Sequence, residues 1–163
     1  KLPENTVLKL DAYTNEIIEI IGNLNDPKID EKISLALYNR KDEFPKQAIQ
    51  EAKSFGDWVD KSLYAREDLT QLQFCTIDPE TAKDHDDAIY FDIKTKTLYV
   101  AIADVSEYVY LNGAIDKEAQ KRGFSIYFPH KSIPMLPREL SENICSLKEN
   151  EDRLSMVSKI QFD

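Results

Sequence analysis

Apolar residues in the first part of the chain fall in short runs that are typical of β-strands. One run covers residues 7–10 and a second covers residues 16–21, with a polar turn between them. Glycine, asparagine and proline at 22–27 then end this unit. Because two strands do not form a stable domain alone, this stretch needs further partners.

The pattern from residue 28 to residue 72 is helical. Asp30 is placed to cap a first helix, and Pro45 suits the first position of a second one. Apolar residues then recur at helical spacing up to Gly56. We expect a helical connector that packs against the following domain, with Trp58 as a core anchor.

From residue 73 the pattern mixes strands and helices. Strands are expected at 73–77, 87–92, 97–103, 124–128 and 153–162, and helices at 114–122 and 137–145. Gly123 would end the first of these helices as a C-terminal cap. The pattern predicts the α+β class, with a mixed sheet and helices.

Composition limits the class of protein. The chain has 163 residues, of which 42% are hydrophobic and 31% charged, enough for one domain or two small ones. No apolar run reaches the length of a membrane helix, and the first residues lack a signal-peptide pattern, so we expect a cytoplasmic location and no membrane partner. Cys75 and Cys145 lie in apolar stretches, lack metal-ligand spacing and are expected to be reduced.

The net charge of −9 argues against a simple nucleic-acid binder. Proteins that bind nucleic acid usually carry a basic surface that neutralises phosphates. We therefore expect these residues alone to bind RNA weakly, above all without divalent ions.

The richest chemistry lies in residues 74–91, which read FCTIDPETAKDHDDAIYF. Asp78, Asp84, Asp86 and Asp87 fall within ten positions, between two strand-like segments. Such acidic runs are often solvated loops. Here, however, the dense like charges repel unless a cation compensates them, and Mg²⁺ or Mn²⁺ prefers carboxylate oxygens. We predict a divalent metal site, and a structural cation without catalysis remains an alternative.

Other acidic motifs fit these residues less well. A calcium-binding EF-hand loop counted from Asp78 would need Gly and Glu where the chain has Lys83 and Ile89. A phosphohydrolase with several histidine ligands would need more than the two histidines present, His85 and His130. We leave His85 unassigned.

The segment TIDPETAKDHDDA resembles the metal-binding signature of the ribonuclease II/ribonuclease R family of exoribonucleases. Four later blocks resemble the same family in the same order: TLYVAIADVSEYV, IDKEAQKRGFSIYFP, IPMLPRELSENICSL and NEDRLSMV. The resemblance covers roughly residues 66–163. It implies three parts: the last strands of a cold-shock or OB-type β-barrel at 1–27, a helical connector at 28–72, and the N-terminal part of an RNB-type catalytic domain at 73–163.

By this resemblance, Asp78, Asp84, Asp86 and Asp87 hold magnesium, with manganese as a substitute, at the 3′ end of single-stranded RNA. Asp86 matches the aspartate most closely tied to the chemical step. Tyr127 matches an aromatic residue that stacks on the terminal nucleotides. The implied reaction is processive 3′-to-5′ hydrolysis that releases nucleoside 5′-monophosphates.

Two arginines and the tyrosine have plainer interpretations. Arg122 and Arg138 could contact RNA, although exposed arginines are usually only solvated charges. Without the resemblance, Tyr127 is better interpreted as a buried strand residue.

The family's catalytic domain runs well beyond the last of these 163 residues. Its later segments supply an arginine at the scissile phosphate and much of the RNA channel, and an S1-type domain often follows. An alternative to the exoribonuclease is therefore a truncated or inactive module that binds RNA or protein without catalysis. The sequence leaves open whether the chain is of the ribonuclease R or the ribonuclease II type.

Overall fold

The computed structural model describes residues 1–163 and divides them into two units. One unit consists of residues 1–44 and 126–133. The other consists of residues 45–125 and 134–163. None of the helices is both long enough and apolar enough to cross a membrane.

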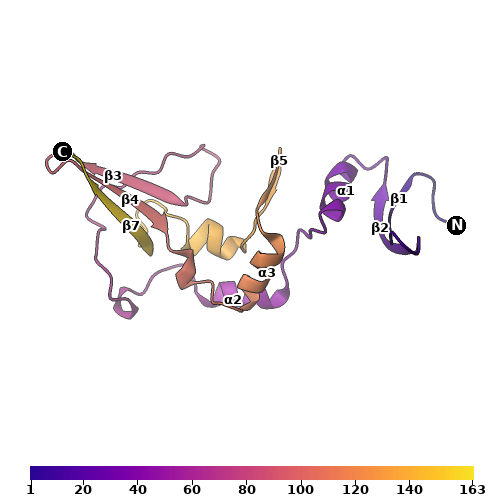
Figure 1. Ribbon diagram of the computed structural model, residues 1–163, viewed down its shortest axis with the longest axis horizontal. Helices are drawn as coiled ribbons and strands as arrows, with labels where there is room; N and C mark the ends of the chain where they lie inside the picture. Colours follow the sequence, from indigo (N-terminus) through magenta and orange to yellow (C-terminus); the bar gives the residue numbers. More distant parts are fainter. The chain divides into compact units, whose positions relative to one another are not determined.

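The first unit begins with an antiparallel hairpin of β1 (Thr6–Leu10) and β2 (Ile17–Asn23), with two irregularities in its register. In the turn between them, one carboxylate oxygen of Asp11 accepts hydrogen bonds from the backbone of the next residues. Helix α1 (Ile29–Leu37) follows, and the short hairpin of β5 (Ile126–Phe128) and β6 (Lys131–Ile133) completes the unit (Figure 1).

Helix α1 does not begin as predicted. The expected cap by Asp30 is wrong, because the helix starts one residue earlier and no side chain caps it. Asp26 orders this end instead: its carboxylate accepts a hydrogen bond from the Lys28 backbone at 2.9 Å and pairs with Lys32 at 2.7 Å. Asp26, which precedes the helix, therefore orders its start, whereas the sequence pattern assigns this role to Asp30, which lies inside the helix.

The second unit contains a three-stranded antiparallel sheet in the order β3–β4–β7, comprising β3 (Asp87–Asp92), β4 (Thr97–Ala103) and β7 (Ser155–Gln161) (Figure 1). The predicted bounds of β3 and β4 are confirmed, and β7 is slightly shorter than predicted. On one face of β4, Thr97, Ala101 and Ala103 are buried, whereas Ile102 on the other face is exposed, as expected for a sheet that covers a core on one face.

Helices α2 (Lys46–Ser54) and α3 (Ala114–Arg122) pack together beside a five-residue π-helix at Leu140–Ile144. Short 3₁₀ turns lie at Lys61–Leu63 and Val105–Glu107. Members of all three helices form the core, together with residues from the end of β4 onward and the residue before β7: Ala48, Ala52, Ala103, Tyr108, Ile115, Leu140, Ile144, Cys145 and Leu154. The predicted helix at 114–122 and its cap at Gly123 (φ 72°) are confirmed.

Three expectations for the second unit are wrong. Pro45 precedes helix α2 as its N-cap residue rather than occupying its first position. Trp58 is 67% exposed, whereas the partly buried Phe55 packs against the core, in edge-to-face contact with Tyr108 at 5.4 Å. Residues 73–77 form no strand, because only Cys75 pairs with β3, through Ile89.

Both cysteines are free, which confirms that they form no disulfide. Cys145 is buried, and this burial raises the pKa of its thiol to about 12. Cys75 is exposed rather than enclosed by apolar side chains. The buried thiol therefore stays protonated near neutral pH.

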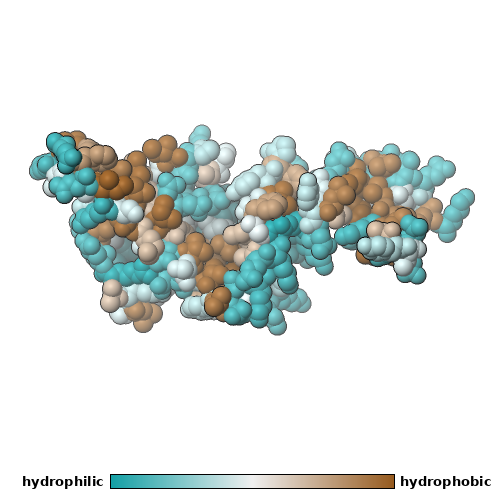
Figure 2. All heavy atoms as spheres, viewed as in Figure 1, coloured by the Kyte–Doolittle hydropathy of each residue, from teal (hydrophilic) through white to brown (hydrophobic).

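Large apolar side chains remain exposed on both units. Figure 2 shows such surface over the β3–β4–β7 sheet and around the β1–β2 hairpin. On the sheet and its turns they are Phe91, Ile93, Ile102, Met156, Ile160 and Phe162. Contiguous exposed apolar surface of this kind commonly marks a face that other protein covers.

A partly buried ion pair joins the segment before the sheet to the end of β4. The Arg66 guanidinium lies 2.8 Å from the Asp104 carboxylate and 2.6 Å from that of Glu107. Burial alone would raise the pKa of Asp104, but the Ser106 hydroxyl and Arg66 outweigh it and hold the pKa below its usual value. The charged form of Asp104 therefore favours the folded state.

This pair predicts an acid-sensitive component of stability. Because the pKa of Asp104 is lowered on folding, its contribution is complete above the ordinary pKa and is lost as the pH falls below about 4 through the lowered value. Replacement of Arg66 by Met should cost roughly 1–3 kcal/mol at pH 7, because the buried carboxylate loses its cation. The acid-dependent component should shrink in that variant. Urea unfolding of both proteins between pH 7 and pH 3 checks this, and equal pH dependence in the two would contradict it.

Candidate functional site

The four aspartates lie before, within and directly after one loop, residues 79–86, that leads into β3. Asp78 precedes the loop, Asp84 and Asp86 lie within it, and Asp87 is the first residue of β3. The loop begins with a turn in which the Ala82 backbone donates to the carbonyl of residue 79 at 2.9 Å. The arrangement follows from the sequence, because Pro79 favours an extended Asp78 and the apolar run after Asp87 favours a strand.

The second unit's sheet fixes both ends of this loop. Cys75, before the loop, and Ile89, in β3 after it, exchange two backbone hydrogen bonds of 2.9 Å, which hold the two flanking segments side by side. The Ala103 backbone donates to the Asp86 carbonyl at 2.9 Å, at the end of β4. The aspartates therefore lie beside two adjacent strand ends, where backbone positions are well defined.

Asp86 is the residue of this loop whose charge is most affected by its surroundings. The residue is exposed, yet protein atoms around its carboxyl partly desolvate it, and the charges of Asp84, Asp87 and Asp78 add to this effect. Together these causes raise the pKa of Asp86. The carboxylates are thus close enough to repel, and a bound cation would relieve that repulsion.

His85, unassigned from the sequence, lies against the first aspartate. Its Nδ1 atom is 2.9 Å from a carboxylate oxygen of Asp78, and both side chains are only about a quarter exposed or less. This hydrogen bond is the main cause of the lowered pKa of Asp78. This contact favours the charged form of Asp78.

The donor chemistry of the loop fits a divalent cation, since four carboxylates supply hard oxygen ligands. The side chains have not converged into a coordination shell: no three His, Cys, Asp or Glu side chains are arranged so that they could hold a metal ion as they stand. Asp78 in particular faces His85. Metal binding would therefore require side-chain rotations within a fixed backbone.

Tyr127 lies in the other unit, on the β5–β6 hairpin opposite Ser132. Its side chain is 72% exposed, so the interpretation as a buried strand tyrosine is wrong. An exposed ring can stack on a base. Its role in RNA binding stays a prediction.

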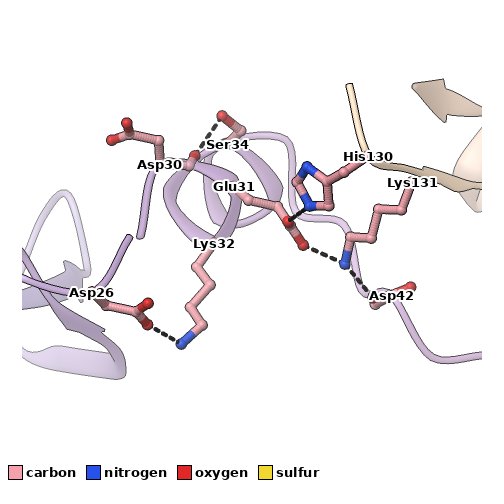
Figure 3. A network of polar contacts seen from close by, with 8 residues as sticks. All are labelled: Asp26, Asp30, Glu31, Lys32, Ser34, Asp42, His130 and Lys131. Atoms are coloured by element: carbon pink, nitrogen blue, oxygen red, sulfur yellow. Dashed lines mark hydrogen bonds and ion pairs between the residues drawn. The ribbon is translucent and has the colours of Figure 1, made fainter. Parts of the chain in front are cut away.

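Charged side chains hold this hairpin to helix α1 within the first unit, as Figure 3 shows. The Glu31 carboxylate forms an ion pair with Lys131 and lies 3.0 Å from Nε2 of His130. Lys131 also pairs with Asp42 at 2.7 Å. The Glu31 side chain is only 11% exposed, whereas His130 and Lys131 are 56% and 31% exposed, so this pairing lies at the surface, where ion pairs contribute little to stability.

The two arginines differ in their surroundings. Arg122 is buried: its Nε donates to Glu118 at 2.9 Å and its Nη1 to the Pro134 carbonyl at 3.1 Å. The interpretation of Arg122 as an exposed RNA contact is therefore wrong. Arg138 is about half exposed and pairs with Glu142 one helical turn away, and its contact with RNA stays a prediction.

Sequence reasoning missed two buried polar residues behind the loop, Ser146 and Arg153. Ser146 is fully buried, and the Arg153 side chain is 4% exposed. The only sequence signal for the serine is a hydroxyl in the otherwise apolar run from Ile144 to Leu147.

Comparison with protein families gives two matches. A model described as "RNB domain" matches residues 66–163, which is more than half of the chain. The chain belongs to the ribonuclease II/ribonuclease R family. A second model, "Ribonuclease R second OB domain", matches residues 1–35. It confirms that the β1–β2 hairpin belongs to an OB-type barrel.

Individual proteins similar to this chain belong to the same family. Ribonuclease R of Helicobacter pylori strain 26695 is 45% identical over the whole chain, which spans 25% of that protein. Two solved structures of Mycoplasma genitalium RNase R match 99% of the chain. The complex with double-stranded RNA is 38% identical with a TM-score of 0.87 over 31% of that protein. The complex with ribose methylated single-stranded RNA is 39% identical with a TM-score of 0.86 over 27% of it. The chain thus spans about a quarter of its curated relatives.

The repulsion around Asp86 predicts a stability change. Asp86→Asn removes one charge from the cluster, so the unfolding temperature in EDTA should rise by up to a few degrees. Magnesium should raise the unfolding temperature of the wild type more than that of the variant, because ligand binding stabilises the folded state. Thermal unfolding with EDTA and with magnesium measures both effects. A lower melting temperature for the variant in EDTA would contradict the prediction.

Proposed function

We propose that this chain is part of a metal-dependent 3′-to-5′ exoribonuclease that hydrolyses single-stranded RNA to nucleoside 5′-monophosphates. The observation that carries the proposal is the group of four carboxylates before, within and directly after one loop, Asp86 among them, within a chain of the ribonuclease II/ribonuclease R family. A solvated acidic loop would not need two strand ends and buried polar groups to fix its backbone.

Asp78, Asp84, Asp86 and Asp87 would hold magnesium, for which manganese is an alternative. A bound divalent ion of this kind lowers the pKa of water and stabilises charge on the phosphate oxygens. The chain's own contribution is to present hard oxygen donors from a fixed backbone. We assign Asp86 the closest role in the chemical step, because it matches the family's aspartate that is most closely tied to that step.

The proposed substrate is the 3′ end of single-stranded RNA. Mycoplasma genitalium RNase R has been solved in complex with ribose methylated single-stranded RNA and in complex with double-stranded RNA. In this chain, the exposed Tyr127 would stack on a terminal base, which tolerates any sequence because every base has a π-face. Arg138 is a further candidate contact.

The net charge of −9 bears on how RNA is held. An acidic surface disfavours phosphates, so we propose that affinity and processivity come largely from further segments of the natural protein. These include the rest of the catalytic domain, with its arginine at the scissile phosphate, and an S1-type domain. We propose a cytoplasmic location for this protein.

Nucleotide release tests the activity. The natural protein that contains these residues is mixed with 5′-labelled single-stranded RNA, with magnesium or with EDTA. Wild type should release 5′-monophosphates only with magnesium and shorten each strand fully before starting the next. Asp86→Asn should fall to the background rate while its RNA affinity stays nearly unchanged.

Other outcomes point elsewhere. RNA binding without release by the wild type would favour a non-catalytic RNA-binding module. Equal loss of folding and activity in Asp86→Asn would favour a structural cation. The 163-residue chain, assayed in parallel, shows whether this part suffices for hydrolysis.

Replacement of Tyr127 by Ala tests the stacking role. One stacked base is worth about 1–3 kcal/mol, so the variant should hold short RNAs less tightly and leave longer end products. Tyr13→Ala is a matched control, because that tyrosine is also exposed and lies in the same unit. A product ladder identical to that of the wild type would remove Tyr127 from the site.

A further inference from the structure

Ser146 lies directly behind the aspartate loop and has no exposed surface. Its Oγ atom donates to the Lys83 carbonyl at 2.8 Å and accepts from the His85 backbone N–H at 3.0 Å. A hydroxyl has one donor and two acceptor sites. This one therefore binds the backbone immediately before and immediately after Asp84.

Further hydrogen bonds hold the serine and the same loop in place. The Arg153 Nε atom donates to the carbonyls of Asn143 and Ser146, at 3.2 Å and 3.1 Å. The Leu147 backbone donates to the His85 carbonyl at 2.8 Å. The segment just after the π-helix thus presents the Ser146 hydroxyl and the Leu147 N–H to the loop, and the buried Arg153 guanidinium holds this segment in place.

The loop has no apolar means of staying in place. No residue from 79 to 86 is buried, and the first buried side chain after it is Ala88. Its four carboxylates, at positions 78, 84, 86 and 87, are like charges close together in the chain and repel one another. Its position therefore depends on the backbone hydrogen bonds from Ser146, Leu147 and the end of β4.

We propose that Ser146 is a positioning residue for the metal-binding aspartates, acting through the backbone on both sides of Asp84. The inference rests on the proposed function and deepens it. A group that orients metal ligands without touching the ion typically contributes about 10- to 100-fold to metal affinity or activity. Ser146 would do so from beneath the loop, while Arg153 holds Ser146.

The test compares Ser146→Ala with wild type in the natural protein. The variant should need about 10-fold or more magnesium for half-maximal nucleotide release, and much of the rate should return at saturating magnesium. Direct titration of Mn²⁺ by electron paramagnetic resonance should show the same loss of affinity. Ser146→Thr, which keeps the hydroxyl, should restore metal affinity at least in part.

Hydrogen exchange supplies a readout that does not depend on activity. In Ser146→Ala without metal, amide exchange should accelerate at residues 83–87 and remain unchanged in β4. Ser54→Ala is the matched control, because the Ser54 hydroxyl also donates to a backbone carbonyl, that of Glu51 at 2.7 Å, in the same unit. It should change neither exchange in the loop nor metal affinity.

Three results would overturn the inference: wild-type metal affinity in Ser146→Ala, unchanged exchange in the loop, or equal loss of protection in the loop and in β4. The last would mean that Ser146 serves the whole fold. Failure of the proposed function is seen separately, as the absence of metal-dependent release by the wild type. The Mn²⁺ titration and hydrogen exchange would then still decide the role of Ser146.

Discussion

Mutual repulsion of like charges is the constraint on which the aspartate loop depends. Four carboxylates within ten residues repel one another and disfavour a compact arrangement, and the loop has no fully buried side chain that could offset this cost. Backbone hydrogen bonds to the end of β4, to β3 and to the segment after the π-helix hold the loop and the residues beside it in place. These backbone hydrogen bonds hold the charged loop in place against that repulsion.

The central strand β4 connects this frame to the core. It pairs with both neighbours along its whole length. Its last residue, Ala103, is part of the core cluster and also donates to the Asp86 carbonyl. Directly after it, Asp104 receives the Arg66 ion pair. Two consecutive residues, Ala103 and Asp104, therefore connect the core and the Arg66 ion pair to the backbone of the aspartate loop.

Much of the fold followed from local sequence signals. The bounds of β3, β4 and α3 were predictable because alternation, helical spacing and a glycine cap act over a few residues. The candidate aspartates could also be located, since their spacing and flanking strands are local. For the same reason the pattern placed a helix near residues 29–37 but missed that Asp26, rather than Asp30, orders its start.

What could not be predicted depends on distant partners. Ser146 binds backbone 61 residues away, so no local pattern identifies its role. Phe55 packs against the core through Tyr108, 53 residues further along the chain, while Trp58 stays exposed, and no local pattern shows which aromatic finds such a partner. The hairpin that carries Tyr127 pairs with Glu31 across 99 residues of chain. Single residues such as these become visible only once the chain is folded.

The contacts made by Ser146 have a consequence for sequence drift among related enzymes. The hydroxyl meets only a carbonyl and an N–H, which every residue except proline provides. The side chains of Lys83 and His85 can therefore change over evolution without loss of these hydrogen bonds, although His85 would give up its contact with Asp78. Position 146 has far less freedom, since only a small side chain that both donates and accepts fits there. Apart from the aspartates, the position that varies least at this site should therefore be Ser146, which lies about 60 residues from the loop in the sequence.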